Sequence, residues 1–188
     1  NCNLSCKKIS HLENHTKQCN KYKWKTNDKI PEIIHQIWIG PKPPPYIWIN
    51  TWKIDYINKY NNFKYILWDN NNIQEILLKY PKIKDIYNIE TEWHGKADIL
   101  RYLILYEYGG IYIDADSVWI NEKNLKELIN KTNESGLFSA KHKNYDLLAN
   151  GVFGCTKNNQ NILWLIDKLR KKKIKKYREK RRFLGVSK

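Results

Sequence analysis

The sequence has 188 residues, of which 41% are hydrophobic and 13% aromatic, enough for one α/β domain with a buried core and short appendages. No window approaches the roughly 18 apolar residues that cross a bilayer, and the first residues lack the apolar stretch of a signal peptide. We therefore expect the chain as given to be soluble, and its compartment stays open, with a cytoplasmic and a Golgi-associated location as the two candidates. The net charge of +15 points to an anionic partner such as nucleic acid, an acidic membrane or an acidic substrate.

Residues 1–28 form a polar extension without sustained apolar periodicity. Three of its cysteines and one of its histidines provide enough ligands for a tetrahedral zinc site, which would make the extension a small zinc knuckle. The alternative is a loosely packed extension without metal. Because the remaining cysteine, Cys155, stands far away, a disulfide framework for the whole domain is not expected. The four candidate zinc ligands are Cys2, Cys6, His15 and Cys19.

Residues 29–170 alternate between strand and helix patterns. Residues 33–39 are mostly β-branched and aromatic and end at Gly40 and several prolines, which predicts a buried strand. Apolar residues at helical spacing predict a helix over 46–60. A short strand over 63–68 and a helix over 73–80 follow.

The second half of the domain continues this alternation. A strongly apolar helix over 96–108 ends at two glycines, which favour a left-handed helix cap. The strand 111–113 then leads into Asp114-Ala115-Asp116. The remaining predicted elements are a helix over 122–131, strands over 136–140 and 148–154, and a helix that begins at 161. The order predicts an α/β fold with a mostly parallel, twisted sheet flanked by helices, and ligands beyond the carboxyl ends of the strands.

Residues 171–188 form a basic tail, rich in lysine and arginine. We expect the last helix to fray beyond Leu169, because few apolar residues remain to pack and dense like charges repel one another. Two interpretations stay open. The tail binds a polyanion or an acidic membrane, or its lysines reflect AT-rich coding DNA and have no specific partner.

Asp114 and Asp116 lie two residues apart at a strand end. An extended backbone would direct both carboxylates to the same side. Two hard anionic oxygens suit Mg²⁺ or Mn²⁺, which completes its coordination with substrate phosphates and water. Such a cation would neutralise charge on a leaving diphosphate.

Three separated motifs resemble the glycosyltransferases with a DXD sugar-binding region. They are Ile30–Gly40, Lys96–Tyr102 and Tyr108–Asp116, and the resemblance extends over about Ile30 to Leu169. This group includes the fungal initiating mannosyltransferase, capsular sugar transferases and, more distantly, the clostridial glucosylating toxins. The resemblance implies a GT-A nucleotide-sugar-binding fold, a sugar-nucleotide donor, a divalent cation and transfer with retention of anomeric configuration.

The same resemblance implies roles for individual residues. Trp38 would stack on the nucleotide base, and Asp98 with Arg101 would hydrogen-bond the donor sugar. Tyr112 and, in a later loop, Asn150 would lie beside the donor. Asp114 would touch ribose, sugar or metal, and Asp116 would bind the metal directly.

Structural interpretations compete with these roles. Trp38 and Tyr112 suit a buried core. Asp98 and Arg101, three residues apart on a helix, suit an ordinary ion pair. Burying charges at the start of an apolar helix is costly, however, which favours a functional role for them. His35 is expected to be a hydrogen-bonded core residue rather than a catalyst.

Members of this group continue well beyond the point where the present sequence ends, so donor binding is better supported than turnover. The sequence predicts a retaining glycosyltransferase that moves a hexose from a UDP- or GDP-sugar to a hydroxyl of a glycan, protein or lipid. One alternative is a catalytically weak or truncated sugar-nucleotide-binding protein. Another is a basic module that binds nucleic acid or an anionic surface.

Overall fold

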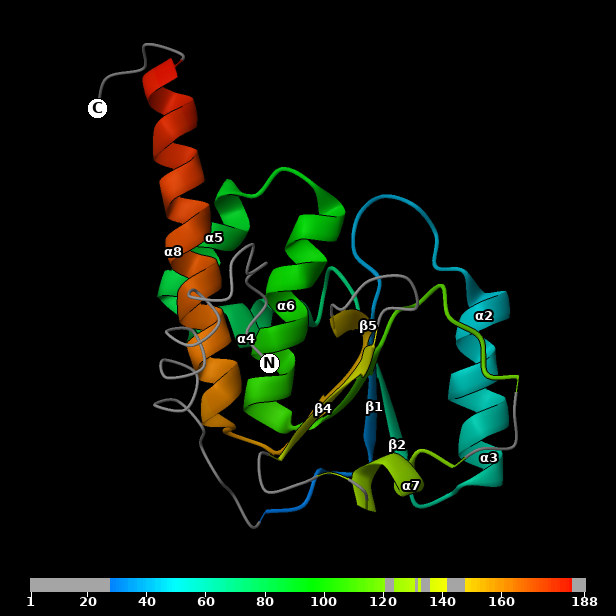
Figure 1. The fold of residues 1–188 in the computed structure, drawn as a ribbon. Coiled ribbons are helices and arrows are strands. Elements are labelled where there is room, and N and C mark those ends of the chain that lie inside the picture. Colours follow the sequence, from blue (N-terminus) through cyan, green and yellow to red (C-terminus); the bar gives the residue numbers. More distant parts are fainter. Residues whose placement is uncertain (1–27, 121–123, 131, 133–135, 142–147, 184–188) are drawn as a thin grey trace.

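A computed structural model describes residues 28–120, 124–130, 132, 136–141 and 148–183. Within these ranges the chain folds into one five-stranded sheet with helices on both faces (Figure 1). The strands are ordered β2-β1-β3-β5-β4 across the sheet. Their bounds are β1 Ile33–Ile37, β2 Lys64–Trp68, β3 Gly110–Ile113, β4 Leu137–Lys141 and β5 Leu148–Cys155.

The predicted α/β class is confirmed, and the parallel pairing holds for one half of the sheet. β1 pairs in parallel with both β2 and β3. β5 pairs antiparallel with both β3 and β4. For β4 and β5 the reason is local, because only six residues separate the two strands, too few for the crossover connection that parallel neighbours need.

Two apolar cores lie on opposite faces of the sheet. Alternate residues of each strand face opposite sides, so in β3 Tyr112 joins one core while Ile111 and Ile113 join the other. The larger core is covered by α4 (Ile73–Lys79), α5 (Pro81–Ile89), α6 (Trp93–Tyr108) and α8 (Gln160–Phe183) (Figure 1). The smaller core is covered by the π-helical turn η1 (Thr51–Tyr56), α3 (Ile57–Lys59) and α7 (Lys126–Asn130), and α2 (Tyr46–Asn50) leads directly into η1.

Two helices differ from the predicted pattern. Pro81 ends α4 as expected, but it also begins α5, which the sequence pattern had not indicated. Proline suits the first helical position because it has no N–H that needs a partner and its φ is already helical. The predicted helix over 46–60 is present, with η1 in its middle.

The expected fraying of the last helix is wrong. α8 runs without a break from Gln160 to Phe183, and its last turns extend beyond the rest of the domain (Figure 1). Ile174 packs against the larger core, and Lys173 forms an ion pair with Glu90. One apolar residue and one paired lysine therefore keep the helix in contact with α5 beyond Leu169. Among the described helices, none is both long and apolar enough to span a membrane.

Candidate functional site

A pocket of about 570 Å³ lies where β1 and β3 end. Three segments border it: residues 37–42 after β1, residues 93–101 at the start of α6, and residues 112–116 at the end of β3. In sheets of this kind, ligands bind beyond the carboxyl ends of parallel strands. The predicted residues Trp38, Arg101, Tyr112, Asp114 and Asp116 all line this pocket.

Arg101 joins the acidic residues of the site. Its guanidinium is almost fully buried, and one nitrogen, Nη2, lies 3.1 Å from Oδ1 of Asp98 and 3.3 Å from Oδ1 of Asp114. Its other terminal nitrogen donates to the carbonyl of Asn150 at 2.5 Å. The guanidinium carbon lies 4.4 Å from the centre of the Tyr112 ring, a cation–π distance. Asp98 and Arg101 thus form part of a network that spans α6, β3 and β5, rather than an isolated helix pair.

Tyr112 and Asn150 complete this network. The Tyr112 hydroxyl donates to Oδ1 of Asp114 at 2.8 Å, and burial raises the pKa of that phenol. The Asn150 amide donates to Oδ1 of Asp98 at 3.2 Å. Tyr112 therefore packs in the core and also holds the Asp114 carboxylate, while its place beside a donor stays a prediction.

The backbone at the acidic pair differs from the expected extended form. The N–H of Ser117 donates to the carbonyl of Asp114 at 3.0 Å, which closes a turn directly after β3. Strand periodicity therefore does not align the two carboxylates. Both residues still border the same pocket, with Asp116 exposed and Asp114 about one third exposed.

Buried polar groups hold this turn in place. Gln36, fully buried in β1, donates from its side-chain amide to the carbonyl of Asp114 at 3.1 Å. The hydroxyl of Tyr65 donates to the Gln36 side-chain oxygen at 2.7 Å. Sequence reasoning missed Gln36, although an amide in an otherwise apolar strand is a signal, because a buried polar group needs partners.

Two tryptophans line the pocket. Trp38 is partly exposed there and its indole N–H donates to the carbonyl of Lys42 at 2.8 Å, so it is not a core residue. Trp93, which sequence reasoning missed, is 47% exposed. Its ring lies against Gly40, where a β-carbon would come within 3.0 Å of it. The positive φ of 110° at Gly40 also favours glycine.

His35 is a structural residue, as predicted. It is fully buried, its Nδ1 accepts the indole N–H of Trp68 at 3.1 Å, and its Nε2 lies 2.9 Å from the carbonyl of Gly109. These partners fix the neutral ring with its proton on Nε2. Burial lowers the pKa of His35 to about 4, against the smaller opposite effect of the Gly109 carbonyl.

The described residues provide few protein ligands for a cation. Among them, no group of three or more histidine, cysteine or acidic side chains is arranged to hold a metal ion. A cation at Asp114 and Asp116 would therefore take its remaining ligands from a diphosphate and water, as Mg²⁺ commonly does. The predicted zinc ligands Cys2, Cys6, His15 and Cys19 lie outside the described residues, so the zinc knuckle stays a prediction.

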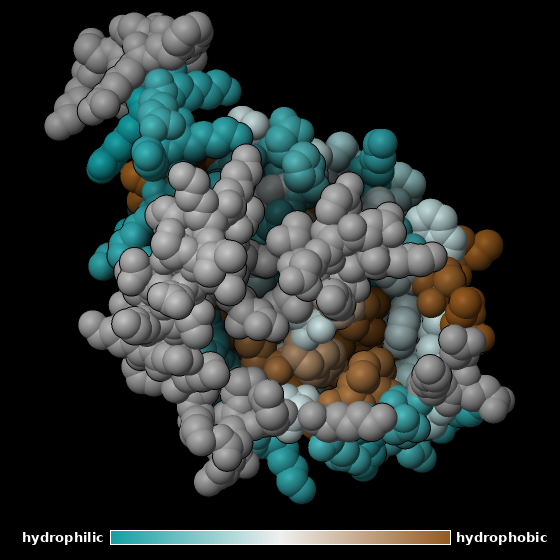
Figure 2. Space-filling model, viewed as in Figure 1, coloured by the Kyte–Doolittle hydropathy of each residue, from teal (hydrophilic) through white to brown (hydrophobic). Residues whose placement is uncertain are grey.

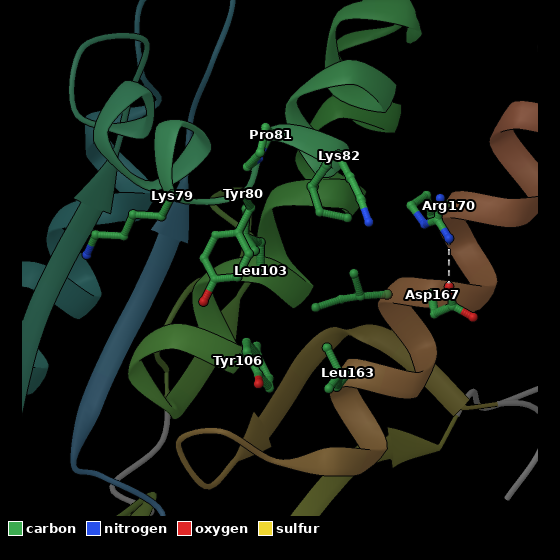
Figure 3. A pocket seen from close by; sticks show the side chains of 11 residues that line it. Lys79, Tyr80, Pro81, Lys82, Leu103, Tyr106, Leu163, Asp167 and Arg170 are labelled. Carbon is green, nitrogen blue, oxygen red and sulfur yellow. Dashed lines mark hydrogen bonds and ion pairs between the residues drawn. The ribbon is translucent and has the colours of Figure 1, made fainter.

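A second pocket, of about 440 Å³, lies between the α4–α5 junction, α6 and α8 (Figure 3). Leu103 and Leu163 contribute apolar surface, and Asp167 and Arg170 form an ion pair at 3.1 Å at its edge. None of the predicted donor-site residues lines it.

Comparisons with known proteins point to one family. Residues 48–135 match the family described as "Glycosyltransferase sugar-binding region containing DXD motif". The chain is 38% identical over 88 residues to inositol phosphoceramide mannosyltransferase 3 of Schizosaccharomyces pombe. The matched segment covers 46% of this chain and 24% of that protein. It is 34% identical over 140 residues to the uncharacterized glycosyltransferase L373 of Acanthamoeba polyphaga mimivirus, which covers 69% of this chain and 51% of that protein.

The fold has a solved counterpart. A structure titled "PaToxG Glycosyltransferase" matches with a TM-score of 0.53 and 22% identity, over 84% of this chain and 66% of that one. The predicted resemblance and fold class are confirmed. The chain spans about a quarter of the first of these curated relatives and about half of the second.

Proposed function

We propose that this chain, a DXD-containing glycosyltransferase, moves a hexose from a nucleoside-diphosphate sugar, a UDP- or GDP-sugar, to a hydroxyl acceptor. We further propose that anomeric configuration is retained and that Mn²⁺ or Mg²⁺ takes part. The observation that carries the proposal is the Arg101 network, because one buried guanidinium contacts both Asp98 and Asp114 beside a pocket that Asp116 also borders.

The charges of this site suit a diphosphate bound together with a cation. The site contains three carboxylates and one guanidinium, from Asp98, Asp114, Asp116 and Arg101. Their net formal charge of about minus two would repel a diphosphate in the absence of a cation. Asp114 and Asp116 are the residues that would hold the divalent ion, which supplies charge neutralisation for the leaving diphosphate. Lys42, exposed at the pocket border, adds one further positive charge.

The remaining roles follow from position. Asp98 does not itself line the pocket, but Arg101 and Asn150 hold it beside the pocket and its side chain is about 39% exposed, so its second carboxylate oxygen would be able to accept a hydroxyl of the sugar. Trp38 and Trp93 offer aromatic faces against which a nucleotide base would stack. The base and the sugar would then occupy different parts of one pocket.

Retention is proposed to follow a front-face path. Arg101 forms ion pairs with both Asp98 and Asp114, which weakens each carboxylate as a nucleophile, so we propose no covalent intermediate with the protein. In the proposed step, the bond between the anomeric carbon and the diphosphate oxygen breaks, and the acceptor oxygen bonds to the same face of that carbon. The proton of the acceptor hydroxyl passes to the departing diphosphate.

Titration calorimetry with UDP- and GDP-hexoses, with and without Mn²⁺, tests the proposal. We expect one of the two nucleotide classes to bind and its affinity to depend on the cation. Product analysis with the same donor then separates a transferase from the alternative of a sugar-nucleotide-binding protein without turnover. Binding that does not depend on the cation would contradict the proposal. So would the absence of binding by both nucleotide classes.

A further inference from the structure

Exposed hydrophobic side chains gather on one side of the molecule. Eleven large hydrophobic residues are exposed among the described residues, and six of them belong to α2, η1 and the segment 118–120. Figure 2 shows hydrophobic surface at the right-hand edge of the molecule, where Figure 1 places α2. We call this set the α2 patch, and its members are Tyr46, Ile47, Trp48, Ile54, Val118 and Ile120.

The two segments of the α2 patch lie side by side. The backbone N–H of Trp119 donates to the Thr51 hydroxyl at 3.0 Å, and the indole N–H of Trp52 donates to the carbonyl of Ser117 at 3.1 Å. The Trp119 ring packs edge-on against the buried Tyr56. Because alternate residues of an extended segment face opposite sides, the inward Trp119 leaves Val118 and Ile120 on the surface.

The patch adjoins the pocket at the ends of β1 and β3, which we call the donor pocket, along both segments. Lys42 lines that pocket and lies four residues before Tyr46, the first residue of α2. Asp116 lines it too and lies two residues before Val118. Whatever covers the patch is therefore held next to the acidic pair.

We infer that the α2 patch docks onto the surface of an anionic lipid bilayer and thereby presents a membrane-embedded hydroxyl acceptor to the donor pocket. The presentation of the acceptor rests on the proposed function, whereas the docking does not. Ile47 and Ile120 are 80% and 81% exposed, an exposure that is costly in water and is relieved by insertion between lipid head groups.

Composition and charge favour a bilayer over a protein partner. Tryptophan and tyrosine next to aliphatic residues are typical of the membrane interface, where one end of the ring is apolar and the other hydrated. Lys42 and Lys53 are exposed nearby and are only partly offset by Asp55, so the surface beside the patch carries a positive charge that suits an anionic leaflet. The printed name of one relative, an inositol phosphoceramide mannosyltransferase, also specifies a lipid acceptor for that protein.

Vesicle flotation of the 188-residue chain tests this inference. The probe is phosphatidylcholine vesicles that contain about one third phosphatidylserine, since that lipid supplies the anionic surface. We expect the chain to float with the vesicles. A double variant, Ile47→Ser with Ile120→Ser, should reduce the bound fraction at least about tenfold. The substituted side chains are exposed, so the fold should survive, and donor affinity measured by calorimetry should stay unchanged.

Two matched variants serve as controls. Leu78→Ser with Leu128→Ser replaces exposed leucines outside the patch and should bind vesicles like the unmodified chain. Lys172→Glu with Lys176→Glu, on the exposed side of α8, should remove only the part of the binding that about 0.5 M NaCl also removes.

Several results would overturn the docking inference. They are no vesicle binding by the unmodified chain, equal binding by the Ile47→Ser and Ile120→Ser variant, an equal loss in the leucine control, or complete loss of binding in high salt. A concentration-dependent dimer that the same double variant abolishes would assign the patch to a second copy instead. Failure of donor binding in the unmodified chain would refute the proposed function and leave the flotation result standing.

Discussion

Gly151 lies directly against Asp114. The backbone N–H of Asp114 donates to the carbonyl of Gly151 at 2.8 Å, and a β-carbon on Gly151 would lie 2.6 Å from Oδ2 of Asp114. This distance is below any normal contact between carbon and oxygen. Arg101 and Tyr112 orient the Asp114 carboxylate through Oδ1. Its other oxygen has room in this position only because residue 151 has no side chain.

Gly151→Ala should displace the Asp114 carboxylate. We expect the fold to survive with a loss of about 1–3 kcal/mol, the usual cost of forcing one extra methyl group into a packed site. Cation-dependent affinity for the donor should fall by about tenfold or more. Calorimetry and thermal unfolding of the same preparation would check both. An unchanged donor affinity would show that the position of Asp114 does not matter for binding.

Asp98→Asn should separate recognition of the sugar from recognition of the diphosphate. Asp98 is proposed to face the sugar, so affinity for the intact sugar nucleotide should fall more than about tenfold while affinity for the free nucleoside diphosphate changes less than about threefold. Competition binding with both ligands measures the difference. Equal losses would return Asp98 and Arg101 to a purely structural role. Arg101→Ala is less informative, because it leaves two neighbouring carboxylates without their shared partner.

His35 should make the stability of the fold depend on pH. Burial lowers its pKa from 6.5 to about 4, so the unfolded chain binds a proton at higher pH than the folded one. The stabilisation is then fully present above about pH 6.5 and is lost as the pH falls toward 4, by on the order of 3 kcal/mol. Denaturant unfolding of the unmodified chain and of His35→Asn between these pH values measures it. If the free energy of unfolding changed with pH by the same amount in both proteins, the pH dependence would not come from His35.

The C-terminal half of α8 should affect stability rather than donor binding. Deletion of residues 171–188 removes the ion pair between Lys173 and Glu90 and the packing of Ile174, so the melting temperature should fall. Donor affinity should stay within about threefold, or ~0.7 kcal/mol. Lys173→Ala should reproduce part of the loss, whereas the exposed Lys172→Ala should not. A large loss of donor affinity would place the end of α8 at the donor pocket.

Local patterns predicted the elements that carry the site. The strand before Gly40, the helix that bears Asp98 and Arg101, and the strand before Asp114 all follow from periodicity and glycine breaks, because burial on one face or both leaves a direct trace in sequence. The resemblance added a prediction of which of their polar residues face a donor.

The features that sequence reasoning missed depend on contacts between distant segments. The turn at Asp114 is held by Gln36, 78 residues away, and its room is set by Gly151 on β5. α8 continues past Leu169 because Glu90, directly after the end of α5, supplies a partner for Lys173. Helix propensity and charge density in the local sequence contain no information about such partners.

The most direct test of the central claim is the Mn²⁺ dependence of donor binding in Asp116→Asn, compared with Asp85→Asn on the exposed side of α5 as a matched loss of one charge. Asparagine keeps the shape of residue 116 but removes the anionic oxygen that a hard cation prefers. We predict that calorimetry shows a loss of about tenfold or more in Mn²⁺-dependent affinity for Asp116→Asn. Asp85→Asn should bind like the unmodified chain. Equal Mn²⁺-dependent affinity in all three proteins would contradict the assignment of this pocket as a cation-assisted sugar-nucleotide site.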